Sequence, residues 1–72
     1  MASLKDLRIE AELTQQYVAE ALKVTERTIR NLEKGSHTPA FSPDQWLIMA
    51  ELYKVTMQQL ALSYRKTFSQ NS

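Results

Sequence analysis

The sequence predicts an all-α fold, a compact bundle of five helices in one domain, and three observations support this. Ala, Leu, Glu, Gln and Lys are common, whereas Gly occurs once and Pro twice, a composition that favours helices. No stretch shows the strict apolar–polar alternation of a half-buried strand. Helix-capping residues precede five segments whose apolar residues recur at helical spacing. We expect residues 1–66 to form the domain and residues 67–72 to be a frayed tail.

The first three helices are each expected to begin after a hydroxyl side chain, because such a side chain accepts a hydrogen bond from an otherwise unsatisfied backbone N–H. The three capping residues are Ser3, Thr14 and Thr25. Gly35, the only glycine, suits the left-handed position that ends the third helix. The residues expected to face inward are Leu4, Leu7 and Ala11, then Val18, Ala19 and Leu22, then Thr28, Ile29 and Leu32.

The last two helices follow a predicted surface loop over residues 36–41, which contains Pro39 and has no helical period. Residues 42–45 combine a Ser cap, Pro at the first helical position, an acid in the first turn and Gln to complete a capping box. Thr56, with Gln59 three residues later, predicts a second capping box at the start of the fifth helix. The apolar residues of these helices are Trp46, Leu47, Met49, Ala50 and Tyr53, then Met57, Leu60, Ala61 and Tyr64.

The junction between the second and third helices indicates a helix-turn-helix unit over residues 15–34. Residues 22–25 leave about three residues between the two helices, which suits the sharp turn of such a unit. The helices can cross closely only where the first is small, and Ala19 stands there. The apolar residues that surround the crossing are Val18, Leu22, Val24, Ile29 and Leu32.

These residues resemble the phage repressor and Cro class of helix-turn-helix regulators (lambda-repressor-like, XRE family), and the similarity covers residues 4–62. Leu13-Thr14-Gln15 is similar to the family's start of helix two, and residues 32–35 are similar to its end of helix three. Residues 46–50 and 55–60 resemble its last two helices. The resemblance implies a sequence-specific transcriptional regulator, a small repressor, that binds double-stranded DNA with its third helix in the major groove.

The sequence departs from the family pattern at two places. Lys23 stands where the family usually has Gly, at a turn position that often needs positive φ. A lysine there costs about 1 kcal/mol, the penalty of a residue with a Cβ in the left-handed region. The loop after Gly35 lacks basic residues except His37, which we expect to be exposed, so the phosphate contact that relatives make there is expected to be weak.

Four residues of the third helix are candidates for base contacts. Arg27 matches the O6 and N7 acceptors of guanine with its planar fork, and Asn31, one turn later, matches adenine. Glu26 can accept from cytosine N4, although the helix N-terminus alone favours an acid there. Thr28 can touch a thymine methyl group or be buried.

Five further residues are candidates for phosphate contacts. Arg30 and Lys34 lie on the outer side of the third helix, and Gln16 and Lys23 are weaker candidates. Gln15 resembles the family residue that holds a phosphate at the start of helix two, where a helix N-terminus already favours an anion.

The resemblance also implies an ion pair between Arg8 of the first helix and Glu33 of the third, with a structural role. A phosphate contact is the competing role for Arg8, and the two are compatible. Loss of one partner of a buried pair costs several kcal/mol.

The last helix is the expected surface of a homodimer, because one helix reads too few base pairs to specify a genomic site. Its apolar residues Met57, Leu60, Tyr64 and Phe68 exceed what a core of this size requires, with Ala61 among them. The alternative is that they all pack inside the domain.

Composition excludes several other functions. The chain has no Cys and one His, and no nucleophile–base pair or Gly-rich phosphate loop, so we expect no enzyme, no metal, no cofactor and no small-molecule ligand. The longest apolar run, residues 46–50, is too short to cross a membrane, and we expect a cytoplasmic protein. The net charge of only +1 leaves open a protein-interaction module, such as the partner-binding part of an antitoxin, that keeps this fold without reading DNA.

Overall fold

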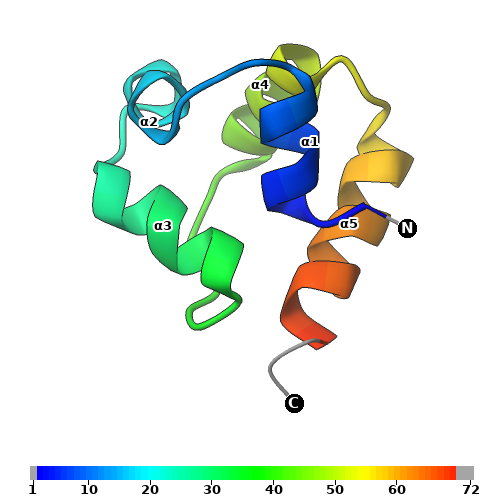
Figure 1. The fold of residues 1–72 in the computed structure, drawn as a ribbon. Helices are drawn as coiled ribbons and strands as arrows, with labels where there is room; N and C mark the ends of the chain where they lie inside the picture. The colour runs from blue at the N-terminus through cyan, green and yellow to red at the C-terminus, as the bar shows by residue number, and fades with distance from the viewer. Residues whose placement is uncertain (1, 70–72) are drawn as a thin grey trace.

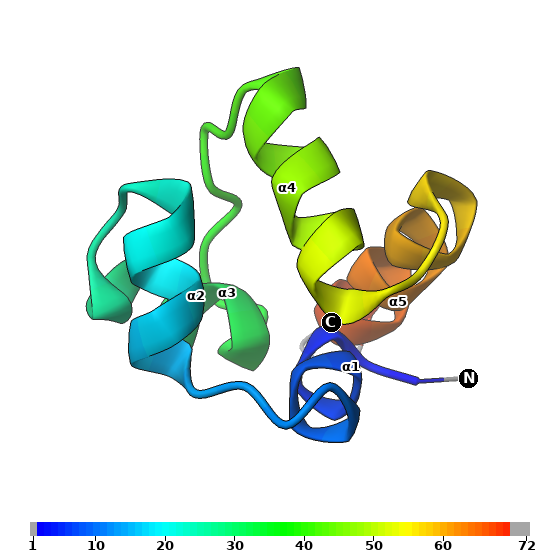
Figure 2. The same ribbon diagram turned by 90° about the horizontal axis from the view of Figure 1, so that it is seen from above.

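The computed structural model describes residues 2–69, and within that range it contains five α-helices and no strand, which confirms the all-α prediction. Figures 1 and 2 show α2 and α3 together on one side of the molecule and α5 on the other, with α1 and α4 between them. The helices are α1 (Leu4–Glu10), α2 (Gln15–Leu22), α3 (Glu26–Lys34), α4 (Pro43–Tyr53) and α5 (Met57–Ser69).

The helices begin where the sequence predicts. Each capping hydroxyl accepts from the backbone N–H three residues later, and these residues are Ser3, Thr14, Thr25, Ser42 and Thr56. Ser42 and Gln45 form the predicted capping box. Ser3 forms a second box with Asp6, which the sequence analysis did not single out, and the hydrogen bonds from the Ser3 backbone and hydroxyl lower the pKa of the Asp6 carboxyl.

Left-handed residues end three of the helices. Gly35 has φ 70° after α3, as predicted, and Lys23 has φ 60° in the turn between α2 and α3, so the lysine adopts the left-handed conformation that this turn position was expected to need. Lys54 ends α4 in the same way with φ 58°, and Glu12 has φ 59° between α1 and α2. The last two positions were not predicted, because neither carries a residue type that favours this region.

The core draws on all five helices. Ala19 is 3% exposed at the crossing of α2 with its neighbours, as its small size predicts. Leu60 is 2% exposed within the same cluster, so most of its side chain packs inside the domain rather than on the predicted dimer surface. The buried apolar residues are Leu4, Leu7, Val18, Ala19, Leu22, Ile29, Leu32, Met49, Ala50, Tyr53 and Leu60.

The end of α5 is ordered helix, so the prediction of a frayed tail from residue 67 is wrong for residues 67–69. Thr67 is 1% exposed, and its hydroxyl accepts from the backbone N–H of Leu4 at 2.9 Å while donating to the carbonyl of Ser63 at 2.9 Å. The last turn of α5 therefore satisfies a backbone donor in the first turn of α1. Residues 70–72 of the predicted tail lie outside the described residues.

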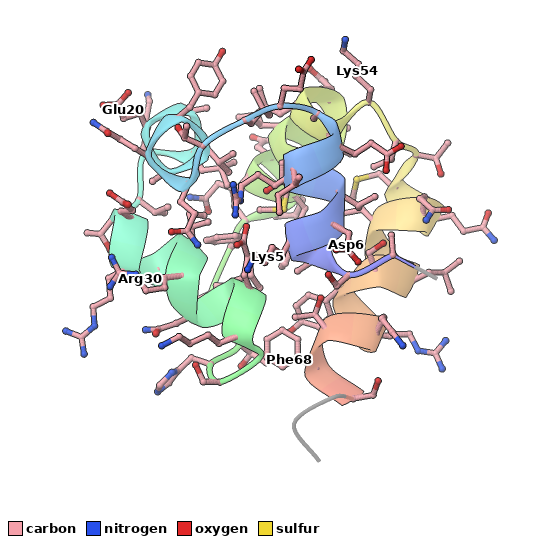
Figure 3. All side chains as sticks on the ribbon, viewed as in Figure 1. Lys5, Asp6, Glu20, Arg30, Lys54 and Phe68 are labelled. Carbon is pink, nitrogen blue, oxygen red and sulfur yellow. The ribbon has the colours of Figure 1, made fainter. Side chains whose placement is uncertain are left out.

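A row of four aromatic rings fastens the loop after α3 to α4 and α5. Phe41 meets Trp46 edge-on with ring centroids 5.0 Å apart, and Trp46 meets Tyr64 edge-on at 5.4 Å. Tyr64 stacks on Phe68 at 4.5 Å. Figure 3 shows Phe68 on the side of α5 that faces α3. Part of the apolar surface of Tyr64 and Phe68 is thus buried inside the domain.

One buried polar atom among the described residues lacks a hydrogen-bond partner, the hydroxyl oxygen of Ser63 in α5. We expect Ser63→Ala to stabilise the domain by about 1 kcal/mol, because it removes an unsatisfied buried hydroxyl and alanine favours helix. Thermal unfolding followed by circular dichroism should then shift upward by roughly 4–8 °C. Thr67→Val, which removes a satisfied buried hydroxyl of similar size, should lower the midpoint, and a lower midpoint for Ser63→Ala contradicts the prediction.

Candidate nucleic-acid interface

The outer face of α3 is polar and points away from the bundle. Arg27, Arg30 and Lys34 are exposed, and Asn31 is half-buried beside them. They share one face because an α-helix has 3.6 residues per turn, which brings residues three and four apart side by side. Figure 3 shows the side chain of Arg30 extending outward from α3. Four of the residues predicted to contact DNA, which are Arg27, Arg30, Asn31 and Lys34, therefore share one face of α3.

The charge of this surface is positive although the chain is almost neutral. Glu26 is the one exposed acid within residues 23–34, since Glu33 there is buried in an ion pair. Six of the eight acids of the sequence lie outside this segment. The exposed cations of the segment are Lys23, Arg27, Arg30 and Lys34. Although the net charge of the chain is only +1, this face of α3 is cationic, and its charge is complementary to that of an anionic partner.

Side chains in the first turn of α3 also form hydrogen bonds within the domain. The Thr25 hydroxyl accepts from the backbone N–H of Thr28 at 3.2 Å, and the two hydroxyl oxygens lie 2.9 Å apart. Thr28 is half-buried, so both readings of this residue from sequence stay compatible with its place. Glu26 is exposed in the same turn, where the helix N-terminus favours its charge.

A buried ion pair joins α1 to the last turn of α3. The Nε of Arg8 donates to Oε2 of Glu33 at 2.6 Å, and Nη2 donates to Oε1 at 3.1 Å. The two side chains are 11% and 4% exposed, so the pair that the resemblance implied is present and largely shielded from water. The hydrogen bond to Glu33 raises the pKa of Arg8 further above its usual value. The Nη1 of Arg8 donates to the carbonyl of Leu13, just before α2, at 2.8 Å.

Gln15 completes this network from the first turn of α2. Its Nε2 donates to Oε1 of Glu33 at 3.0 Å, a contact that the sequence analysis missed because no local pattern pairs residues that are 18 positions apart. The turn at Lys23 joins α2 and α3 at one end, and the bond between Gln15 and Glu33 joins them at the other. The helix-turn-helix unit is therefore fixed at both of its ends.

Two further groups support this unit from α4. Gln45 donates from Nε2 to the carbonyl of Leu22 at 2.9 Å, which caps the C-terminal end of α2. Tyr53 is 5% exposed near the ion pair, and burial raises the pKa of its hydroxyl, with the charge of Glu33 adding to the rise and that of Arg8 opposing it. Tyr53 consequently stays neutral at any pH near 7.

Neither a metal-binding cluster nor a membrane-spanning helix is present in residues 2–69. They contain no group of three or more His, Asp or Glu side chains placed to hold a metal ion. None of the five helices in residues 2–69 has the length and apolar character that crossing a membrane demands.

Comparison with known protein families identifies the two-helix unit and its surroundings. A family model described as helix-turn-helix matches residues 4–60, which include all of α1 to α4 and the start of α5. The matched segment contains the whole two-helix unit, its turn and the ion pair that supports it. No curated protein and no solved structure gives a significant match.

We expect Glu33→Ala to destabilise the domain by about 3–5 kcal/mol, because the guanidinium of Arg8 is then buried without its carboxylate. Urea unfolding followed by circular dichroism measures the change. The matched control is Glu10→Ala, which removes an exposed acid and should change stability by less than about 0.5 kcal/mol. The double variant with Arg8→Met and Glu33→Leu removes both charges and should recover much of the loss. Equal effects of Glu33→Ala and Glu10→Ala would show that the pair contributes nothing.

Proposed function

Since the chain belongs to the helix-turn-helix family of DNA-binding regulators, we propose that it is a small repressor that reads the major groove of double-stranded DNA with α3. The observation that carries the proposal is the cationic outer face of α3, set on a two-helix unit that is fixed at both ends. A rigid unit favours binding because little conformational freedom is lost when DNA is contacted.

Arg27 and Asn31 are the proposed base readers. Arg27 lies in the first turn of α3, the part of a recognition helix that enters the groove most deeply, and it is fully available to a guanine. Asn31 lies one turn later and is matched to adenine. Glu26 and Thr28 flank Arg27 and are proposed to contact cytosine and a thymine methyl group.

Phosphate contacts are proposed on either side of these readers. Arg30 and Lys34 of α3 are proposed to contact phosphates of one strand, and Gln16 and Lys23 to contact phosphates from α2 and the turn after it; all four are exposed. Gln15 is proposed to contribute its backbone N–H at the start of α2, because one amide hydrogen of its side chain is already donated to Glu33. In this proposal the side chain of Gln15 holds α2 to α3 through Glu33, and its backbone N–H contacts the phosphate.

A homodimer is proposed to form through the exposed side of α5. Met57 is 45% exposed beside a groove of about 450 Å³ that lies between α4, α5 and the loop before α4. A protruding side chain and a groove on the same surface allow a two-fold contact in which each copy fills the groove of the other. The groove is lined by Pro39, Trp46, Met57, Leu60, Ala61, Tyr64 and Arg65.

Binding to duplex DNA at several salt concentrations tests the proposed function. Affinity for random duplex should fall steeply as salt rises, because bound cations release the counterions of the phosphates. Arg30→Ala should weaken binding to all sequences about equally and reduce the salt slope by about 1. Arg27→Ala should instead relax discrimination at one base pair of a selected site by about 1–3 kcal/mol.

Two outcomes of these measurements separate the alternatives. If Arg27→Ala behaves like Arg30→Ala, the assignment of Arg27 to a base is wrong. If the wild-type chain binds no duplex even at low salt, DNA binding is rejected for this chain and the protein-interaction module is favoured. Glu20→Ala, a change on an exposed residue of α2, serves as the control that should leave base discrimination unchanged.

We expect Met57→Glu to disrupt the dimer without unfolding the domain, because it places a charge in an apolar contact but on a side chain that the single domain leaves exposed. Analytical ultracentrifugation should show a dimer for the wild type and a monomer for the variant. Ile9→Glu, on another exposed apolar residue of α1, is the matched control. Dimerisation that survives Met57→Glu but is lost with Ile9→Glu would move the interface to α1.

A further inference from the structure

The last helix, α5, carries positive charges and no acid. Residues 57–69 contain Arg65 and Lys66 but neither Asp nor Glu. Arg65 is exposed and Lys66 is half-buried, and neither forms an ion pair within residues 2–69. Figure 3 shows Arg30 extending from α3 on one side of the molecule and α5 on the other. The cations of α5 therefore form a second positive surface, apart from the outer face of α3.

Arg65 stands where the apolar groove beside α5 meets a second cavity. It lines the groove of about 450 Å³, together with Trp46 and Met57, and it also lines a cavity of about 370 Å³ at the end of α5. Met57, Ala61 and Arg65 are spaced four residues apart, which places them on one side of the helix, and all three are exposed. A partner that lies along this side of α5 therefore contacts apolar side chains first and a positive charge next.

The surroundings of the groove supply no negative charge to these cations. Arg65 and Lys66 are the charged residues that line the groove and the cavity beyond it. Asp44, the acid nearest to Trp46 along the chain, lines neither of them. A two-fold dimer through α5 brings two acid-free helices together, so the α5 of a second copy offers no carboxylate to Arg65. A partner with carboxylates beside its apolar residues is complementary to both the groove and the cations.

We propose that this groove and the cations beside it bind an acidic amphipathic helix of another protein, which displaces the second copy from the proposed homodimer. The displacement rests on the proposed function, whereas the docking itself does not. DNA phosphates can pair with the cations but leave the apolar groove empty, so an amphipathic helix fits this surface better than a nucleic acid. Because a dimer reads two half-sites, a partner that separates the copies lowers the affinity for the DNA site.

A selection from a displayed library of helical peptides tests the proposal. Leu and Phe are fixed on one face of each peptide, and the other positions vary among Glu, Gln and Lys. The wild-type chain should enrich Glu over Lys. The selected peptide should change the fluorescence of Trp46, the only tryptophan of the chain and a lining residue of the groove. Arg65→Glu should weaken its binding roughly five- to tenfold, because an attraction becomes a repulsion.

Lys5→Glu is the matched control, since it makes the same charge change on an exposed residue of α1 and should alter peptide binding by less than about twofold. Arg30→Glu tests the cationic face of α3 as the alternative site. Binding that is lost with Arg30→Glu but kept with Arg65→Glu overturns the proposal. Because Arg65, Lys5 and Arg30 are exposed, the three variants are expected to fold, which circular dichroism verifies.

Two further results contradict docking at the groove. One is enrichment of Lys-rich or uncharged peptides, and the other is binding of Glu-rich peptides that leaves the fluorescence of Trp46 unchanged. A loss of affinity for random duplex in Arg65→Ala, without any loss of peptide binding, assigns the cations of α5 to DNA phosphates instead.

Analytical ultracentrifugation with the selected peptide tests the displacement. The dimer should give way to a complex of one chain with one peptide. A dimer that persists with the peptide bound overturns the displacement. A chain that is monomeric without any peptide contradicts the proposed homodimer, while the docking of an acidic helix is still decided by the peptide measurements, which contain no DNA.

Discussion

The buried carboxylate of Glu33 is the interaction on which the arrangement of the other helices depends. Three hydrogen bonds reach it, two from Arg8 of α1 and one from Gln15 of α2, and its side chain is 4% exposed. Two helices joined only by a short turn would be free to change their angle. With Glu33 bonded at the open end, α2 and α3 act as one rigid body whose outer side is the cationic face.

The loop between α3 and α4 connects the two surfaces that are proposed to bind partners. Pro39 lines both a hollow of about 300 Å³ beside Thr28 and Asn31 of α3 and the groove beside α5. Phe41 is the first of the four aromatic rings that end at Phe68 of α5. A second copy on α5 and a nucleic acid on α3 would therefore contact opposite sides of one short loop. The loop has few conformations open to it, because Ser36 is bonded to α3 at one end and Phe41 is packed at the other.

The features that the sequence predicted are those decided by neighbouring residues. Thr25 caps α3 because the N–H that it accepts lies three residues away, and Lys23 takes a left-handed conformation because the length of the turn demands it. The features that it missed depend on residues far apart in the chain. The partner of Gln15 and the burial of Leu60 and Thr67 are settled only when α3 and α1 meet α2 and α5, and periodicity alone does not say which neighbour a helix face will meet.

The hydrogen bond from the backbone of Leu4 to the hydroxyl of Thr67 spans 63 residues of a 72-residue chain. During synthesis the first turn of α1 therefore finds this partner only after Thr67 has left the ribosome. A contact of such high sequence separation makes a large loop-closure contribution to the folding barrier, even in a helical protein whose other contacts are mostly local. The start of α1 and the end of α5 consequently depend on each other, and a nascent chain that lacks the last turn of α5 leaves a polar backbone group of α1 unsatisfied.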